Sequence, residues 1–185
     1  ARQVTLVSQD AHIGFAFSVE DIVAMGRNPH LGRFAVADRH DLKRIRQAMQ
    51  QTAVAKLAKR RIDTLSGGER QRTMIARAIT QETPIVLLDE VTANLDLCHQ
   101  LEVMEIAQGM ARSGRLVIAA LHDLNLAARY CDRLLLLAQG QIQADGPPGQ
   151  VLTQMHLRRY FGIDARIDIH PSTAGLQIVP LRAAA

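Results

Sequence analysis

The sequence predicts an α/β protein with a mostly parallel sheet core and an inserted helical subdomain. After residue 65, short apolar runs such as "IVLLD" and "RLVIAAL" alternate with helical patterns. Continuous apolar character is typical of strands that helices cover on both faces of a parallel sheet. Residues 10–64 instead show mostly helical periodicity. With 185 residues, 48% of them hydrophobic, the chain is long enough to bury a core.

The first half of the chain begins with one strand and continues with helices. The β-branched run "QVTLV" predicts the strand. Next, "SVEDIVAMGR" predicts a helix that Ser18 caps and that Gly26 and Pro29 end. Residues 38–61 carry apolar side chains at helical spacing, which predicts one long helix.

The second half alternates strands with helices. A strand "IVLLD" precedes a helix that Asp96 caps and Gly114 ends, and "RLVIAAL" precedes a short helix "HDLNLAARYC". The stretch "RLLLLAQGQIQADG" predicts a hairpin that turns at Gln139 and Gly140. Prolines begin a predicted helix in "PPGQVLTQMHLRRYFG", and "ARIDI" and "LQIVP" predict two short strands.

Composition argues against several classes of protein. The net charge is +4, but basic residues are spread among acids, and aromatics make up 3% with no Trp, so we expect no nucleic-acid partner. The longest apolar runs are too short to span a bilayer, and no secretory signal opens the chain, which favours a cytoplasmic location. Cys98 and Cys131 lack metal-type spacing and are expected to be free thiols of unassigned role.

Two adjacent acids, Asp89 and Glu90, follow the apolar run "IVLL". Open α/β sheets bind ligands at the carboxyl ends of their strands, where these acids fall. Neighbouring residues on a strand point to opposite sides, so one acid could serve Mg²⁺ and the other could orient or deprotonate a water. The alternative is a strand end with two solvated acids leading into a turn.

Gln9 and His122 also follow predicted strands. If those strands are parallel neighbours of "IVLLD", both side chains converge on the edge that holds Asp89 and Glu90. A His there could hydrogen-bond a transferring phosphate, and a Gln could position water or complete a metal shell. The alternative for His122 is a neighbour of a helix N-cap or a satisfied core group.

The stretch "LSGGERQR" places two glycines at a helix start. Ser66 and Glu69 have capping-box spacing, whereas Gly67 and Gly68 each cost a helix about 1 kcal/mol relative to Ala. Bare amides at a helix N-terminus suit a phosphate, although an ordinary capped helix is the alternative. One helix end contributes only about 0.3–1 kcal/mol to an anion, whereas millimolar affinity needs roughly 4 kcal/mol. This helix start can therefore only complete a nucleotide site whose main phosphate-binding residues lie elsewhere.

A P-loop of the pattern G-x-x-x-x-G-K-[ST] would supply those phosphate-binding residues, and these 185 residues do not contain this pattern. The nearest imitation, "GMARSGR", lies at the wrong end of a helix.

These motifs together resemble those of ABC-type ATPases. "LSGGERQR" resembles their signature motif, "IVLLDE" their Walker B strand and "TANLD" their D-loop, while His122 matches the switch histidine and Gln9 the Q-loop. All five stand in the family's order. "VEDIVAMGRNPHLGRF" and "HDLNLAARYCDRLLLLAQGQIQADGPP" look most like ATPase subunits of importers for iron chelates, haem and cobalamin.

The resemblance implies a P-loop NTPase-like core, here N-terminally incomplete, that uses ATP and Mg²⁺. The expected segments are 1–9 up to the Q-loop, 10–64 as the helical subdomain, 65–160 as the ATPase core, and 161–185 as C-terminal strands and tail. Val91 departs from the family, which usually has Pro after the catalytic Glu. We expect the missing N-terminal portion to carry the P-loop, and this chain alone to bind ATP poorly and to be inactive.

The resemblance also implies a division of labour in a head-to-tail pair of subunits. Asp89 would serve Mg²⁺, Glu90 would orient the hydrolytic water, and His122 would contact the γ-phosphate. Gln9 would join the Mg²⁺ or water shell. Ser66, Gly67 and Gly68 would contact the γ-phosphate in trans, Gln71 would also bind the nucleotide, and Asp96 would help to join the two sites.

The implied partners are a second copy of the ATPase subunit, transmembrane permease subunits and, indirectly, a substrate-binding protein. The protein would lie on the inner face of the cell membrane, where segment 10–64 receives a helix of the permease. Two alternatives remain: a truncated non-catalytic module that docks on the permease, and an ABC ATPase with a task other than transport. The transported substrate is not readable from these residues.

Overall fold

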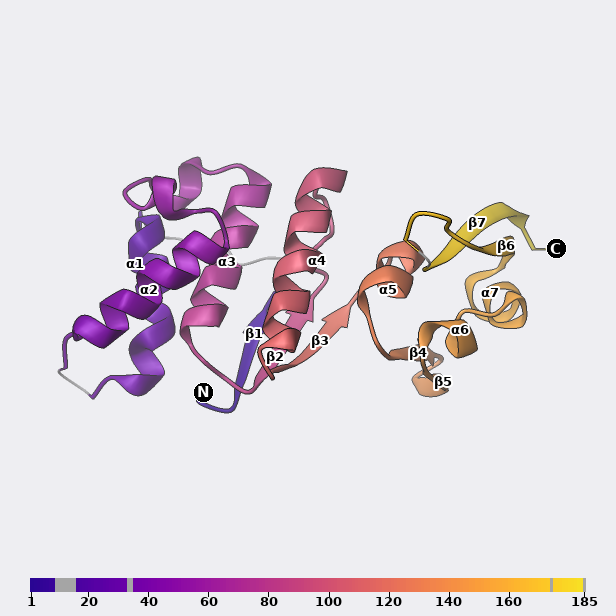
Figure 1. Cartoon of the computed structure of the whole chain (residues 1–185), viewed down its shortest axis with the longest axis horizontal. Helices are drawn as coiled ribbons and strands as arrows, with labels where there is room; N and C mark the ends of the chain where they lie inside the picture. Colours follow the sequence, from indigo (N-terminus) through magenta and orange to yellow (C-terminus); the bar gives the residue numbers. More distant parts are fainter. Residues whose placement is uncertain (9–15, 33–34, 174, 185) are drawn as a thin grey trace. The chain divides into compact units, whose positions relative to one another are not determined.

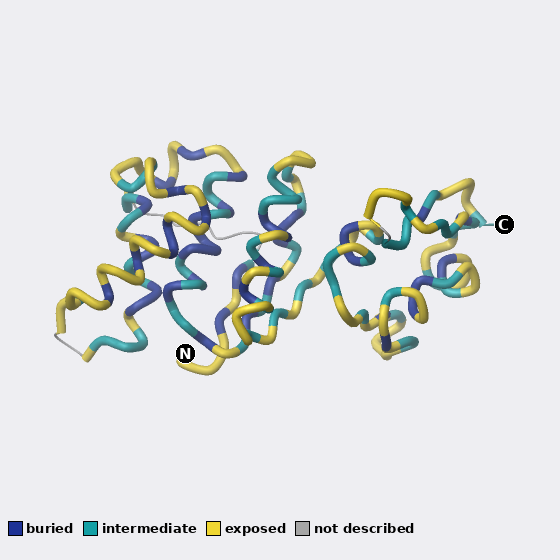
Figure 2. Tube along the Cα trace, in the orientation of Figure 1, coloured by how far each residue is buried: buried dark blue, intermediate teal, exposed yellow. Residues whose placement is uncertain are grey.

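The structure, a computed structural model, describes residues 1–8, 16–32, 35–173 and 175–184 (Figure 1). It forms two compact units, Ala1–Ala120 and Leu121–Ala185. Each unit has its own cluster of buried apolar side chains. Figure 2 colours the buried residues of both units dark blue along the Cα trace. No helix within the described ranges is both long and apolar enough to cross a membrane. The predicted division into four segments stays a prediction.

The first unit combines a three-stranded sheet with a group of helices (Figure 1). Its order confirms the predicted alternation of strands and helices. The elements are β1 (Val4–Val7), α1 (Val19–Ala24), the 3-10 helix η1 (Met25–His30), α2 (Arg39–Gln51), the short 3-10 helices η2 (Ala55–Leu57) and η3 (Ile62–Thr64), α3 (Gly67–Thr80), β2 (Ile85–Asp89), α4 (Leu97–Arg112) and β3 (Leu116–Ala120).

The sheet has the order β1-β2-β3, and both pairs of neighbours are parallel, as predicted. Val7, Val86 and Leu88 are almost fully buried, in one cluster with side chains of α3 and α4. The opposite face differs from the prediction, because Leu6 and Ile118 are about half exposed at 51% and 49%. Among the described residues, helices therefore cover one face only, although apolar side chains occupy both.

The predicted long helix over 38–61 is wrong in its length, because α2 ends at Gln51. The Val54 amide donates to Met49 O at 2.9 Å and the Ala53 amide to Gln50 O at 3.1 Å. This pair of bonds is a Schellman motif, with Ala53 in the left-handed position at φ +55°. Gly usually occupies that position, so the sequence carried no signal of the helix end.

The second unit contains α5 (Leu124–Tyr130), the antiparallel hairpin of β4 (Leu134–Ala138) and β5 (Gln141–Gly146), α6 (Pro148–Val151), α7 (Gln154–Phe161), and a second hairpin of β6 (Ile163–Ile169) and β7 (Leu176–Ala183). Gln139 and Gly140 have φ of +53° and +73°, which confirms the predicted tight hairpin turn. The single helix predicted after the prolines is wrong. It breaks at Leu152, and Thr153 caps α7 by accepting the His156 amide at 3.2 Å.

Candidate functional site

The start of α3 has the predicted capping box. Ser66 Oγ accepts the Glu69 amide at 3.3 Å, and Glu69 Oε2 accepts the Ser66 amide at 2.9 Å. The hydrogen bond from the Ser66 amide, helped by the Ser66 hydroxyl, holds the pKa of Glu69 below its usual value. First-turn amides have no acceptor within a helix, so the capping box leaves Gly67 and Gly68 as the donors that a ligand could use.

The two glycines lie in different surroundings. A Cβ on Gly67 would meet nothing within 4 Å, and Gly67 is exposed. A Cβ on Gly68 would lie 2.6 Å from Cδ2 of His99, and Gly68 is buried. Gln71, the third predicted nucleotide contact on this helix, is only 9% exposed. Within the described part of the chain, its buried Nε2 has no hydrogen-bond partner.

The predicted Walker B acids stand at the carboxyl end of β2, as expected. Asp89 is the last residue of the strand, lies beside Ala120 of β3, and is exposed. Glu90 lies beyond the strand with φ +50°, so the strand's alternation of side chains does not reach it. A non-Gly residue in this left-handed region costs about 1–3 kcal/mol, and such residues cluster at functional sites.

Val91, which stands where the family usually has Pro, is 1% exposed and belongs to the main core cluster. Burial of this side chain anchors the turn that follows Glu90. The Ala93 amide also donates to Glu90 O at 2.9 Å. The turn is thus fixed by packing and by a backbone hydrogen bond, so Pro is not needed to hold it.

Asp89 fits the requirements of a magnesium ligand. Among the residues that the structure describes, its carboxylate has no hydrogen-bond or ion-pair partner. Carboxylate oxygens are preferred by Mg²⁺, which keeps several waters and needs only one or two protein ligands. An exposed, unpaired carboxylate at the sheet edge leaves room for such a water shell.

Asp96 of the predicted D-loop is the N-cap of α4. Its Oδ1 accepts the His99 amide at 2.9 Å and lies 2.7 Å from His99 Nδ1. The hydrogen bond from the His99 amide and then the one from the ring lower the pKa of Asp96. The structure therefore brings Asp96 of the predicted D-loop and Gly68 of the predicted signature motif together through His99. Sequence reasoning missed this residue, because a lone His as the third residue of a helix carries no motif.

Gln9 and His122 are not placed against these residues. Gln9 lies outside the described residues, although Val7, two positions earlier, lies beside Leu88 of β2. His122 is exposed and belongs to the second unit. The predicted convergence of both side chains on Asp89 and Glu90 stays a prediction.

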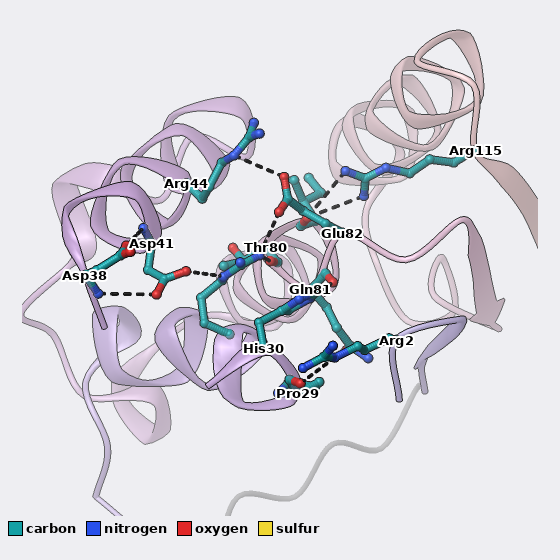
Figure 3. A network of polar contacts seen from close by, with 12 residues as sticks. Arg2, Pro29, His30, Asp38, Asp41, Arg44, Thr80, Gln81, Glu82 and Arg115 are labelled. Atoms are coloured by element: carbon teal, nitrogen blue, oxygen red, sulfur yellow. Dashed lines mark hydrogen bonds and ion pairs between the residues drawn. The ribbon is translucent and has the colours of Figure 1, made fainter. Parts of the chain in front are cut away.

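Basic side chains from η1 and from the position before β3 lie at the opposite end of α3 (Figure 3). Arg27 Nη1 donates to Thr80 O at 2.9 Å, His30 Nε2 lies 2.8 Å from Gln81 O, and both Arg115 amino groups lie 3.4 Å from Ile79 O. The last carbonyls of a helix have no amide donor one turn ahead within the helix, and they form its negative end. Sequence reasoning missed this cluster, because its contacts join residues 36, 51 and 53 positions apart.

Arg27 is the centre of this cluster and is only 5% exposed. It also pairs with Asp41 of α2 at 2.8 Å and with Glu82 at 2.7 Å, and Arg44 holds the other oxygen of Glu82 at 3.1 Å. Burial alone would raise the pKa of Asp41. Hydrogen bonds from Arg27 and from the Asp38 amide outweigh that effect, so the pKa of Asp41 lies below its usual value. The cluster thus joins η1 and α2 to α3.

A second group of potential metal ligands lies at the start of α2. Asp38, His40 and Asp41 bring ligand atoms within 4.8 Å of one another. Asp38 and Asp41 form the capping box of α2, and Asp41 also binds Arg27. The helix start and the ion pair account for this arrangement without a metal.

A groove of about 550 Å³ lies among the end of α2 and the sides of α3 and α4. It contains the Arg72–Glu102 ion pair at 2.5 Å. None of the predicted site residues that the structure describes lines it, so this groove is separate from the candidate nucleotide site.

Comparisons with known proteins agree with the motifs. The family model described as "ABC transporter" matches residues 1–93. The chain is 43% identical to a cobalamin import ATP-binding protein of Halobacterium salinarum, over 98% of this chain and 45% of that protein. It is 39% identical to a ferric enterobactin transport ATP-binding protein of Escherichia coli, over 98% of this chain and 67% of that protein.

A solved structure of a metal-chelate type ABC transporter in an inward-facing conformation matches with a TM-score of 0.87 and 32% identity. The match covers 98% of this chain and 74% of that one, which confirms the predicted fold class. The chain spans about half to two thirds of the length of the relatives that it matches.

Proposed function

Because this chain belongs to the ABC transporter family, we propose that it forms part of the ATP-binding and ATP-hydrolysing subunit of an ABC importer. The observation that carries the proposal is the start of α3. Its capping box occupies the Ser66 and Glu69 amides and leaves those of Gly67 and Gly68 for an anion. The same unit holds Asp89 and Glu90 at the carboxyl end of the central strand.

The nucleotide would lie between two copies of the protein. A single helix terminus contributes about 0.3–1 kcal/mol to an anion, which is too little to hold ATP alone. Ser66, Gly67, Gly68 and the nearby Gln71 would therefore act on a γ-phosphate gripped by the opposing subunit. Closure of the pair around ATP would join the two sites, with Asp96 at the junction.

The acids at the end of β2 would perform the chemistry. When bound, Mg²⁺ would neutralise charge on the phosphates, and Asp89 would hold it through its exposed carboxylate. Glu90 would orient the attacking water and accept its proton. His122 would contact the γ-phosphate, and Gln9 would complete the metal or water shell.

The transported substrate would be an iron chelate, haem or cobalamin, by analogy with relatives named for import of cobalamin and hemin and for transport of ferric enterobactin. The subunit would then lie on the inner face of the cell membrane. Its partners would be permease subunits and, indirectly, a substrate-binding protein. Residues 10–64 would receive the permease.

The proposal is tested by Glu90→Gln in the full-length protein assembled with its permease. ATP turnover should fall by about 10²-fold or more while ATP still binds, because Gln keeps the shape but cannot take a proton. Glu105→Gln is the matched control, because Glu105 is an exposed acid on α4 outside the site, and it should leave turnover unchanged. Unchanged turnover in Glu90→Gln would remove Glu90 as the base and favour a non-catalytic docking module.

A further inference from the structure

We propose that His99 is a positioning residue that fixes the predicted D-loop against the signature helix of the same chain, and that it is the reason why residue 68 is glycine. The proposal rests on the proposed function for its catalytic consequence. Its structural part concerns only the contact among Gly68, Asp96 and His99, all within the first unit.

The contact between His99 and Gly68 leaves no room for a Cβ at residue 68 while the ring keeps its position. Three ring atoms of His99 lie 2.6–3.0 Å from the place where a Cβ would stand on Gly68. Real Cβ atoms do not approach other atoms within 3.0 Å, so a side chain at 68 would displace the ring. Gly67, one residue earlier, meets nothing within 4 Å. Packing against His99 therefore requires a glycine at residue 68, whereas packing places no such requirement on residue 67.

Asp96 fixes the orientation of the His99 ring. Its Oδ1 accepts both the backbone amide and Nδ1 of His99, at 2.9 and 2.7 Å. Because a carboxylate only accepts hydrogen bonds, Nδ1 of the ring donates to Asp96. With Nδ1 held at Asp96, the edge that bears Cδ2 and Nε2 lies against Gly68. The ring thus acts as a spacer between the N-cap of α4 and the first turn of α3.

This spacer joins two segments that the chain connects only through the rest of α3 and through β2. Both segments are ones that we propose to face the second copy of the protein. A displacement of Asp96 would therefore move the ring, and the ring would move the amides of Gly67 and Gly68. Because misplacement of catalytic groups by about 1 Å can lower rates by up to about 10²-fold, loss of the spacer should reduce turnover.

The contact is tested first by thermal unfolding of this chain with Gly68→Ala, His99→Ala and the double variant. With His99 present, Gly68→Ala should lower Tm by about 3–10 °C through overpacking. In the His99→Ala background the same change should shift Tm by less than about 2 °C. Equal losses in both backgrounds would overturn the explanation of Gly68.

The positioning role is tested by ATP turnover of the full-length protein with its permease. His99→Ala should lower kcat about 10-fold while KM for ATP stays within about 2-fold. His99→Asn should restore most of kcat, because its amide can still donate to Asp96. A lower Tm with unchanged kcat in His99→Ala would show a structural role only and overturn the proposal.

The two proposals fail separately. If Glu90→Gln leaves turnover unchanged, the catalytic function is wrong, whereas the unfolding cycle of residues 68 and 99 still reports on the contact. If Glu90→Gln abolishes turnover and His99→Ala does not lower it, the function stands and the positioning role is wrong.

Discussion

The two ends of α3 differ in what surrounds their backbone groups. At the C-terminal end, the carbonyls of Ile79, Thr80 and Gln81 each lie within hydrogen-bonding distance of a side chain from another element. At the N-terminal end, the capping box is local, and Gly67 is open. The C-terminal end is thus held by side chains from other parts of the chain, and the N-terminal end is the one that we propose to contact a ligand.

The largest loss of stability is expected when Arg27 is removed from the C-terminal end of α3. Arg27→Met would leave Asp41 and Glu82 without their buried partner and Thr80 O without a donor. Breaking a buried pair in this way costs about 3–5 kcal/mol. Urea unfolding of this chain measures the loss. Arg46→Met, on the exposed side of α2, is the matched control and should stay within about 0.5 kcal/mol. Equal losses in both would mean that the cluster does not anchor α3.

Acid titration tests the contacts at the C-terminal end of α3 in a second way. The pKa of Asp41 is lowered in the folded protein, so its contribution is full above its unfolded pKa of about 3.9 and is lost as pH falls through the folded pKa. Asp41→Asn should cost about 1.5–3 kcal/mol at neutral pH, as expected for a hydrogen bond to a charged group. The gap in unfolding free energy between the two proteins should narrow below about pH 4. A gap that is constant down to pH 2 would contradict the assignment.

Close packing near the C-terminal end of α3 predicts a somewhat smaller loss of stability for Gly26→Ala. A Cβ there would lie 2.4 Å from the backbone oxygen of Arg77, which cannot move without shifting α3. Overpacking of this kind costs about 1–3 kcal/mol. Gly109→Ala is the control, because it lies within α4 with open space, and it should stabilise the chain by up to about 1 kcal/mol. Calorimetric unfolding of both variants decides whether α1 and η1 are pressed against α3.

The smallest effect on stability is expected at Gly67, at the N-terminal end of α3. Gly67→Ala should change the unfolding free energy by less than about 0.5 kcal/mol, because the new methyl group meets nothing. In the full-length protein with its permease, it should nevertheless lower ATP turnover by obstructing the approach of a phosphate. A large loss of stability with normal turnover would reverse the roles of the two ends.

The sequence predicted the elements with local signals and missed those without them. Ser18, Ser66 and Asp96 mark helix starts through their side chains, and all three are N-caps in the structure. The end of α2 was missed because Ala53 occupies a left-handed position that normally shows as Gly. Coverage of the sheet was overestimated, since apolar strands do not say which segments pack on them.

The candidate site was predicted where a motif is contiguous. The signature stretch and the pair Asp89–Glu90 could be recognised because each lies within a few residues at an element end. The contact of His99 with Gly68 and the pairing of Arg27 with Glu82 join residues 31 and 55 positions apart. Neither contact is set by local periodicity, so only the folded chain reveals them.

Hydrogen exchange along α3 tests the difference between its ends most directly. The measurement uses the full-length Glu90→Gln protein with its permease, with and without ATP. We predict that ATP slows exchange at the amides of residues 66–69, of which the capping box leaves those of Gly67 and Gly68 for a phosphate, and leaves residues 79–82 unchanged. Slower exchange at residues 79–82 with none at 66–69 would contradict the assignment of the N-terminal end to the nucleotide.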